Sequence, residues 1–175
     1  MFKFNCLLCG AVCCTFKSEE ESPLVFPWEK RRLERLNKSS MFEPYIIYKI
    51  NNEEIGVLMY RWKIEGRCPF LNREGRCTIH NSKPLSCKMF PLIIGLDDFT
   101  LRVSADCEVV KNHINDLETS DPKSSFPAEY PHAMKVFELI IKYDREAKKK
   151  GWNREIFKKE YSAHRIIDID NLIKI

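Results

Sequence analysis

The 175-residue chain contains no long apolar run. Its longest apolar stretches, such as 92–96, fall far short of the about 20 residues that a membrane-spanning helix needs. The amino-terminal residues also lack the apolar core of an export signal, because the first cysteine already stands at position 6. We therefore expect a cytoplasmic protein with no membrane partner.

Sequence motifs of common enzyme chemistries are missing as well. There is no glycine-rich G-x-G-x-x-G loop for a nucleotide, no H-E-x-x-H zinc motif and no G-x-S-x-G nucleophile elbow. The cysteine spacing of radical S-adenosylmethionine enzymes is also absent, because Cys9 and Cys13 match its first gap but no third cysteine follows at the required distance. The sequence thus identifies no substrate site.

Cysteine, in contrast, is abundant up to position 107 and absent after it. In the reducing cytoplasm, clustered thiols bind metal more often than they form disulfide bonds. Metal binding is therefore favoured over disulfides, and over burial of each cysteine as a small apolar side chain. The eight predicted metal ligands are Cys6, Cys9, Cys13, Cys14, Cys68, Cys77, Cys87 and Cys107.

The spacing of these cysteines supports the prediction. Two residues separate Cys6 from Cys9, a distance at which a turn directs two thiolates toward one metal centre while backbone N–H groups point at the sulfurs. The adjacent Cys13 and Cys14 would form a strained disulfide, and we expect their side chains to diverge toward different metal atoms or partners. Turn-forming residues stand near the later cysteines, namely Pro69, Gly75 and Pro84.

Two kinds of metal centre suit eight thiols. Structural zinc takes four tetrahedral ligands, so eight cysteines would fill two zinc sites. A [4Fe–4S] iron–sulfur cluster also takes four thiolates, and Cys68-Pro69 is similar to the cysteine–proline that ends ferredoxin ligand runs. The expected divergence of Cys13 and Cys14 gives iron a slight preference. Nearby basic residues could offset the charge of such a centre, namely Arg67, Arg76, Lys83 and Lys88.

The ordered cysteine string also resembles a known family. The segments CLLCGAVCC, CPFL, CTIH and KPLSCKMFP, followed by Cys107, are similar to the CxxCxxCC (YkgJ-like) family of zinc- or iron-chelating cysteine-cluster proteins. The resemblance covers residues 4–110 and implies metal binding through all eight cysteines, with no settled reaction. The chain departs from the family pattern in having three residues between Cys9 and Cys13, and lysine rather than arginine at positions 83 and 88.

Local patterns predict an α+β fold. Residues 26–37 suit a short amphipathic helix, and the β-rich runs 43–50 and 55–64 suit a hairpin. A second hairpin over 91–104 would place Cys87 and Cys107 at the same end. The tail predicts two helices, over 128–151 and 153–164.

The cysteine distribution predicts the domain organisation. We expect a cysteine-cluster domain over 1–115, irregular, hairpin-rich and centred on metal, and a linker over 116–127. A helical extension over 128–175 would pack on that domain as a C-terminal layer.

The leading function is a metal-binding protein that holds an iron–sulfur cluster or zinc, with electron transfer as its expected role. One alternative is a zinc-stabilised adaptor that docks a protein partner through its basic tail, in which residues 135–160 carry nine basic and five acidic side chains. The other is a cluster-dependent redox or group-transfer enzyme. A nucleic-acid partner is not expected, because the basic excess is small.

Overall fold

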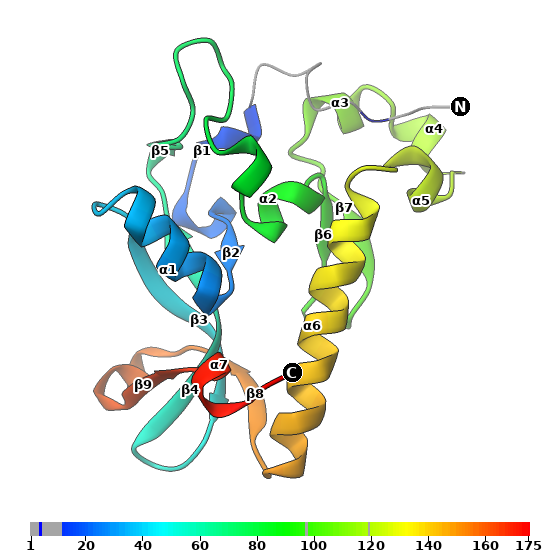
Figure 1. Ribbon diagram of the computed structural model, residues 1–175. Helices are drawn as coiled ribbons and strands as arrows, with labels where there is room; N and C mark the ends of the chain where they lie inside the picture. Colours follow the sequence, from blue (N-terminus) through cyan, green and yellow to red (C-terminus); the bar gives the residue numbers. More distant parts are fainter. Residues whose placement is uncertain (1–3, 5–11, 97, 119) are drawn as a thin grey trace. The chain divides into compact units, whose positions relative to one another are not determined.

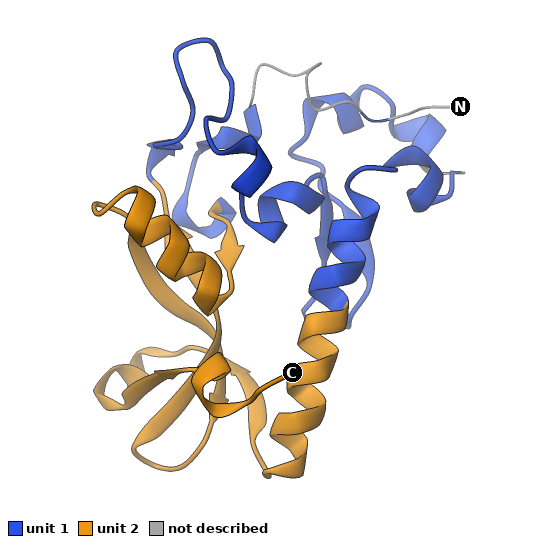
Figure 2. Ribbon diagram, viewed as in Figure 1, with its two compact units in different colours: residues 1–21, 65–137 blue, residues 22–64, 138–175 orange. Residues whose placement is uncertain are grey.

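The computed structural model describes residues 4, 12–96, 98–118 and 120–175 and is a mixed α+β protein, as predicted (Figure 1). The chain divides into two compact units. Unit 1 contains residues 1–21 and 65–137, and unit 2 contains residues 22–64 and 138–175 (Figure 2). Each unit is thus assembled from two separate stretches of sequence. The division into a domain over residues 1–115 and an extension over residues 128–175 stays a prediction.

Unit 2 is centred on a five-stranded sheet with the order β2-β4-β3-β8, in which β9 also pairs with β4. Strands β3 and β4 are antiparallel neighbours joined by a short turn, which confirms the first predicted hairpin. Both β2 and β9 lie along the other edge of β4, with β9 parallel to it. Helix α6 (Tyr130–Lys149) belongs partly to each unit. The other elements of unit 2 are β2 (Leu24–Val25), α1 (Pro27–Leu36), β3 (Met41–Lys49), β4 (Glu54–Lys63), β8 (Asn153–Ile156), η5 (Lys159–Ala163), β9 (Arg165–Asp168) and α7 (Ile169–Leu172).

Strand β4 forms the centre of the unit 2 core. Its six successive residues from 55 to 60 are all buried, so the strand is apolar on both faces rather than alternating. Helix α1 confirms the predicted amphipathic helix and begins with Pro27, which a first helical turn accepts. Its Leu33 is fully buried, and Trp28 stacks on Phe26 with the ring centroids 4.6 Å apart.

A carboxylate network joins four elements of unit 2. The Tyr60 hydroxyl of β4 donates a hydrogen bond of 2.5 Å to Asp168, and Arg31 of α1 donates one of 2.6 Å to the same carboxylate. Arg31 also pairs with Asp170 of α7. Burial and the bond to Asp168 raise the pKa of Tyr60, which therefore stays a proton donor at physiological pH.

Unit 1 holds two small two-stranded sheets, β1 with β5 and β6 with β7, among short helices. The β6–β7 pair confirms the second predicted hairpin, with Leu92 opposite Val103. A bond of 2.8 Å from the Ser104 N–H to the Pro91 carbonyl extends it, so the segments that carry Cys87 and Cys107 leave at the same end. The elements of unit 1 are η2 (Val12–Cys14), β1 (Thr15–Phe16), η3 (Glu19–Glu21), β5 (Gly66–Arg67), η4 (His80–Ser82), α2 (Leu85–Met89), β6 (Leu92–Ile94), β7 (Leu101–Val103), α3 (Glu108–Lys111), α4 (Ile114–Glu118) and α5 (Pro122–Ser125).

The long helix α6 (Tyr130–Lys149) confirms the first predicted tail helix. It ends just before Gly151, whose φ of 75° is a backbone conformation that favours glycine. The division between the units falls inside this helix, after Phe137. None of the described helices combines the length and the apolar composition of a membrane span.

The second predicted tail helix, over 153–164, is wrong. Its first residues form β8, which pairs with β3 from Ile46–Ile156 to Lys49–Asn153, and its later residues form the short 3-10 helix η5. The exposed edge of β3 offers unpaired backbone groups, and pairing with them outweighs the local helical pattern. The tail therefore completes the sheet rather than forming a wholly helical layer.

We expect Asp168→Ala to lower the free energy of unfolding by about 1–3 kcal/mol, because it leaves the buried Tyr60 hydroxyl without an acceptor. The matched control is Arg165→Ala, which removes the exposed ion pair with Glu54 at 3.2 Å and should cost at most about 0.5 kcal/mol. Urea unfolding followed by circular dichroism measures both. Equal losses for the two variants would show that the network adds no stability.

Candidate metal centre

Six of the eight predicted ligands lie in the described part of the chain, and all six belong to unit 1. They are Cys13, Cys14, Cys68, Cys77, Cys87 and Cys107. The other two, Cys6 and Cys9, lie outside the described residues.

Cys68 and Cys77 occupy two similar turns. In each turn the backbone N–H two residues further on donates a hydrogen bond to the sulfur, from Phe70 to Cys68 and from Ile79 to Cys77. The two turns are joined directly, because the Thr78 N–H donates a bond of 2.8 Å to the Phe70 carbonyl. N–H···S bonds of this kind stabilise thiolates and orient sulfur ligands around a metal.

The loop between these turns is closed by its own backbone. The Asn72 N–H donates a bond of 2.9 Å to the Arg76 carbonyl, and Gly75 has a φ of 74° that a side chain would disfavour. The predicted turn role of Gly75 is therefore confirmed. The closed loop holds Cys68 and Cys77 in fixed register, with Leu71 bridged to Cys77.

Backbone pairing brings Cys14 to the same place. Thr15 pairs with Arg67 in the β1–β5 sheet, and next to this pair the Cys68 N–H donates a bond of 2.8 Å to the Cys14 carbonyl. The thiolate charge of Cys14 in turn acts on both Cys68 and Cys77. Three thiols from separate segments thus lie within electrostatic reach of one another.

The structure brings the thiols of Cys13 and Cys14 together. A hydrogen bond from Cys13 is the main cause that lowers the pKa of Cys14 to about 7; the charge of Lys83 adds to it and burial opposes it. The expectation that these neighbouring side chains diverge is therefore wrong, because the turn of η2 lets one thiol donate to the other. The slight preference for iron over zinc depended on that divergence, and the contact between the two thiols does not support it.

In the absence of a bound cation, Cys68 and Cys77 stay protonated. Burial raises the pKa of Cys68 to about 11, against the bond from Phe70, and burial also raises the pKa of Cys77. A bound metal cation reverses this preference, because coordination deprotonates a thiol. The donor set therefore suits a metal that thiolates bind strongly, such as zinc or iron.

The remaining predicted residues lie elsewhere in unit 1. Cys87 is on α2, and Cys107 is buried at the start of α3. Whether Cys87 and Cys107 share a centre with the Cys14 group stays a prediction.

The described residues alone do not form a complete metal site. Within them, no three histidine, cysteine, aspartate or glutamate side chains are grouped so as to hold a metal ion. Sequence reasoning overlooked two titratable groups of unit 1, Glu129 and His132, both of which experience the charge of Lys83. Their separation by three residues at the start of a predicted helix was the signal for their proximity.

Residues 5–119 match a family model described as "CxxCxxCC: Putative zinc- or iron-chelating domain". The match covers more than half of the chain and includes all eight cysteines, so the protein belongs to this family. It is accordingly a metal-binding protein of the zinc- or iron-chelating class. Neither the curated proteins nor the solved structures gave a match.

We predict that Cys14 is the most reactive of the three grouped thiols in the metal-free, folded protein. At pH 7.5 a pKa of about 7 leaves about three quarters of Cys14 ionised, whereas a pKa of about 11 leaves roughly one Cys68 in three thousand ionised. Timed iodoacetamide labelling with peptide mass spectrometry measures the rates, and circular dichroism checks that the chain stays folded.

Two variants at Cys13 provide the control. Cys13→Ala removes the hydrogen-bond donor, so the pKa of Cys14 should rise and its labelling at pH 7.5 should slow, whereas Cys13→Ser retains a donor and should preserve most of the rate. If Cys14 and Cys68 label at the same rate in folded protein, the assigned geometry is wrong.

Proposed function

We propose that the protein holds a metal centre through Cys14, Cys68 and Cys77, completed by other cysteines of the cluster, and that the iron-loaded form transfers electrons. The observation that carries the proposal is that these three thiols, from separate segments, lie within electrostatic reach of one another, two of them with backbone N–H···S bonds. Such bonds are characteristic of thiolate ligands in both zinc and iron–sulfur centres.

The ligand set of the proposal extends to the whole cysteine string. A tetrahedral zinc ion or a [4Fe–4S] cluster takes four thiolates, so Cys14, Cys68 and Cys77 leave at least one ligand to be supplied. Cys13 is adjacent to Cys14, and Cys6 and Cys9 precede it in the matched family region. Cys87 and Cys107 would then serve the same centre or a second one.

Electron transfer is the role that an iron–sulfur cluster would give to this chain. Lys83 acts on the thiolates of Cys14 and Cys77, and a fixed positive charge near an anionic cluster raises its reduction potential. Backbone donors at Phe70 and Ile79 have the same effect. Zinc has no redox chemistry, so with zinc the centre would be structural and would stabilise the loops of unit 1.

The basic tail offers less support for an adaptor. Lysines of α6 pair with glutamates one turn away, Lys142 with Glu138 at 2.7 Å and Lys149 with Glu146 at 2.6 Å. Paired charges along an exposed helix face are typical of a solvated surface. We therefore keep metal binding as the proposed function and make the adaptor an outcome of the experiment below.

Cys68→Ser and Cys77→Ser should each reduce the metal content of the purified protein and lower its melting temperature, because metal affinity contributes directly to folding free energy. The control is Lys149→Ala, an exposed residue whose ion pair is worth little. Metal analysis after anaerobic purification should give one or two metal sites per chain for the wild type. Normal metal content in both cysteine variants would exclude these two residues as ligands.

If iron is bound, the protein should be brown as isolated and reversibly reducible by dithionite without unfolding, because the donors around the sulfurs stabilise both oxidation states. Electron paramagnetic resonance detects the reduced cluster, and circular dichroism detects any loss of fold. A colourless protein that contains zinc would contradict electron transfer and favour the adaptor. Iron that leaves on reduction would also contradict it.

A further inference from the structure

The loop between Cys68 and Cys77 is held closed by one residue, Asn72. Its side-chain oxygen Oδ1 accepts two hydrogen bonds, one of 2.8 Å from the Arg76 N–H and one of 3.1 Å from the Glu74 N–H. Its own N–H donates a bond of 2.9 Å to the Arg76 carbonyl. The side chain and the backbone of Asn72 therefore both act on the end of the loop that leads into Cys77.

Asn72 also acts on the beginning of this loop. The guanidinium group of Arg67, the residue immediately before Cys68, donates a hydrogen bond to the Asn72 carbonyl. At the other end, Arg76 is the residue immediately before Cys77. Asn72 is thus bonded to the residue that precedes each of the two thiols.

Each of these thiols is fixed within its own turn. Backbone hydrogen bonds close the two turns, from the Leu71 N–H to the Cys68 carbonyl at 3.0 Å and from the His80 N–H to the Cys77 carbonyl at 3.3 Å. An N–H···S bond inside each turn orients the sulfur. The distance between the two sulfur atoms therefore depends on how the loop between the turns is held, which is where Asn72 acts.

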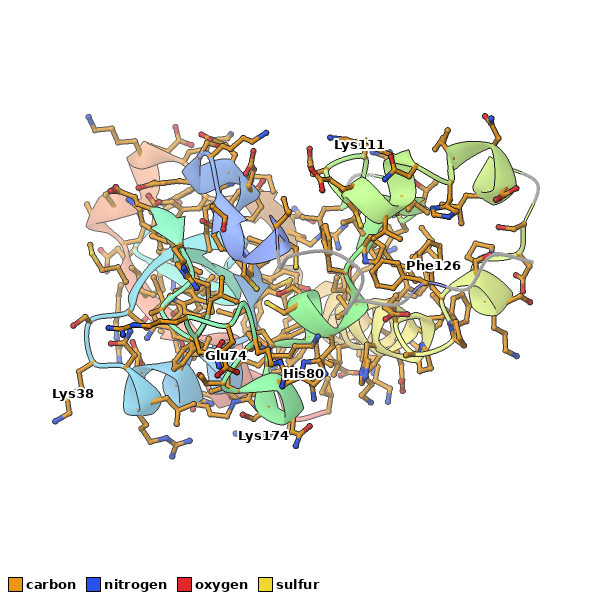
Figure 3. The ribbon with its side chains drawn as sticks, turned by 90° about the horizontal axis from the view of Figure 1, so that it is seen from above. Lys38, Glu74, His80, Lys111, Phe126 and Lys174 are labelled. Carbon is orange, nitrogen blue, oxygen red and sulfur yellow. The ribbon has the colours of Figure 1, made fainter. Side chains whose placement is uncertain are left out.

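The hydrogen bonds of Asn72 are local to this loop. Within the described part of the chain, all of them go to residues 67–76. Figure 3 shows Glu74 of the loop well apart from Lys111 and Phe126, which belong to other segments of unit 1. None of these bonds involves a sulfur atom, so they hold the loop closed without a metal. Asn72 therefore serves the two ligand turns rather than the wider fold of the unit.

We propose that Asn72 is a positioning residue of the metal centre, which holds Cys68 and Cys77 at the spacing of two ligands before the metal binds. The inference rests on the proposed function, in which both cysteines are ligands. A site whose ligands are already in place loses less conformational entropy on binding, so it binds its metal more tightly. Asn72 would thus raise metal affinity without contacting the metal.

Titration of the full-length, reduced and metal-free chain with Co²⁺ against a competing chelator tests this role. Cobalt is a suitable probe because it binds thiolate sites and, unlike zinc, gives a visible spectrum. Asn72→Ala should weaken Co²⁺ binding about tenfold to a hundredfold, because it removes both hydrogen bonds to Oδ1. Asn72→Asp keeps an acceptor oxygen and should restore most of the affinity. At saturation the thiolate-to-cobalt absorption of Asn72→Ala should equal that of the wild type, because no ligand is lost.

The matched control is Asn51→Ala in unit 2. The Asn51 side-chain oxygen accepts the Glu53 N–H at 2.8 Å and the Glu54 N–H at 2.9 Å, so the variant removes a turn of the same kind. Unit 2 contains no cysteine. Asn51→Ala should therefore leave Co²⁺ affinity unchanged, whatever it costs in stability.

A second pair of variants decides the result if circular dichroism shows that Asn72→Ala does not fold. Arg67→Ala keeps Asn72 and removes only the guanidinium bond to its carbonyl, so it should still weaken Co²⁺ binding. Arg73→Ala removes an equal charge from an exposed position of the same loop and should not. Equal affinities for these two variants would count against the positioning role.

The outcomes separate this inference from the proposed function. Wild-type affinity in folded Asn72→Ala, an equal loss in Asn51→Ala, or no recovery in Asn72→Asp would overturn the positioning role while Cys68→Ser still loses metal. Wild-type affinity in both Cys68→Ser and Cys77→Ser would instead refute the proposed ligands, and the positioning role with them.

Discussion

The backbone pairing of β1 with β5 is the constraint on which the thiol group depends. Cys14 and Cys68 are fifty-four positions apart, and the chain between them leaves unit 1 to build the β3–β4 hairpin of unit 2. Joining the ends of so long a segment costs conformational entropy. At the base of the insertion, the Ser22 hydroxyl and the Ile64 backbone form two buried hydrogen bonds. These bonds offset part of that entropy cost.

Burial and charge act in opposite directions on the thiols that this pairing collects. Burial alone keeps Cys68 and Cys77 protonated, while donors at Cys13 and the charge of Lys83 favour the thiolate of Cys14. A metal cation satisfies both requirements, because it neutralises thiolates whose partial burial disfavours the charged form. The thiol group and its metal are thus energetically coupled.

The residues beyond 150 have a structural role that their composition does not indicate. The family match ends at residue 119, whereas β8 and β9 come from residues beyond 150 and pair with β3 and β4. The Arg31–Asp168–Tyr60 network fixes the end of β9 to helix α1. The sheet that lies within the family-matched region is therefore completed by strands from outside it.

The sequence by itself determined the features that depend on local signals. Apolar spacing, Pro27 and Gly151 were sufficient to predict α1, α6 and both hairpins. The order of the cysteines was sufficient to predict the family and its metal binding. These signals are local because helix ends, turns and ligand spacing are set by neighbouring residues.

Tertiary structure alone decided the rest. Pairing with the edge of β3 turned an expected helix into β8, and the turn of η2 placed the Cys13 thiol against Cys14 instead of apart from it. Such contacts depend on long-range backbone pairing and burial, which propensity and spacing do not encode.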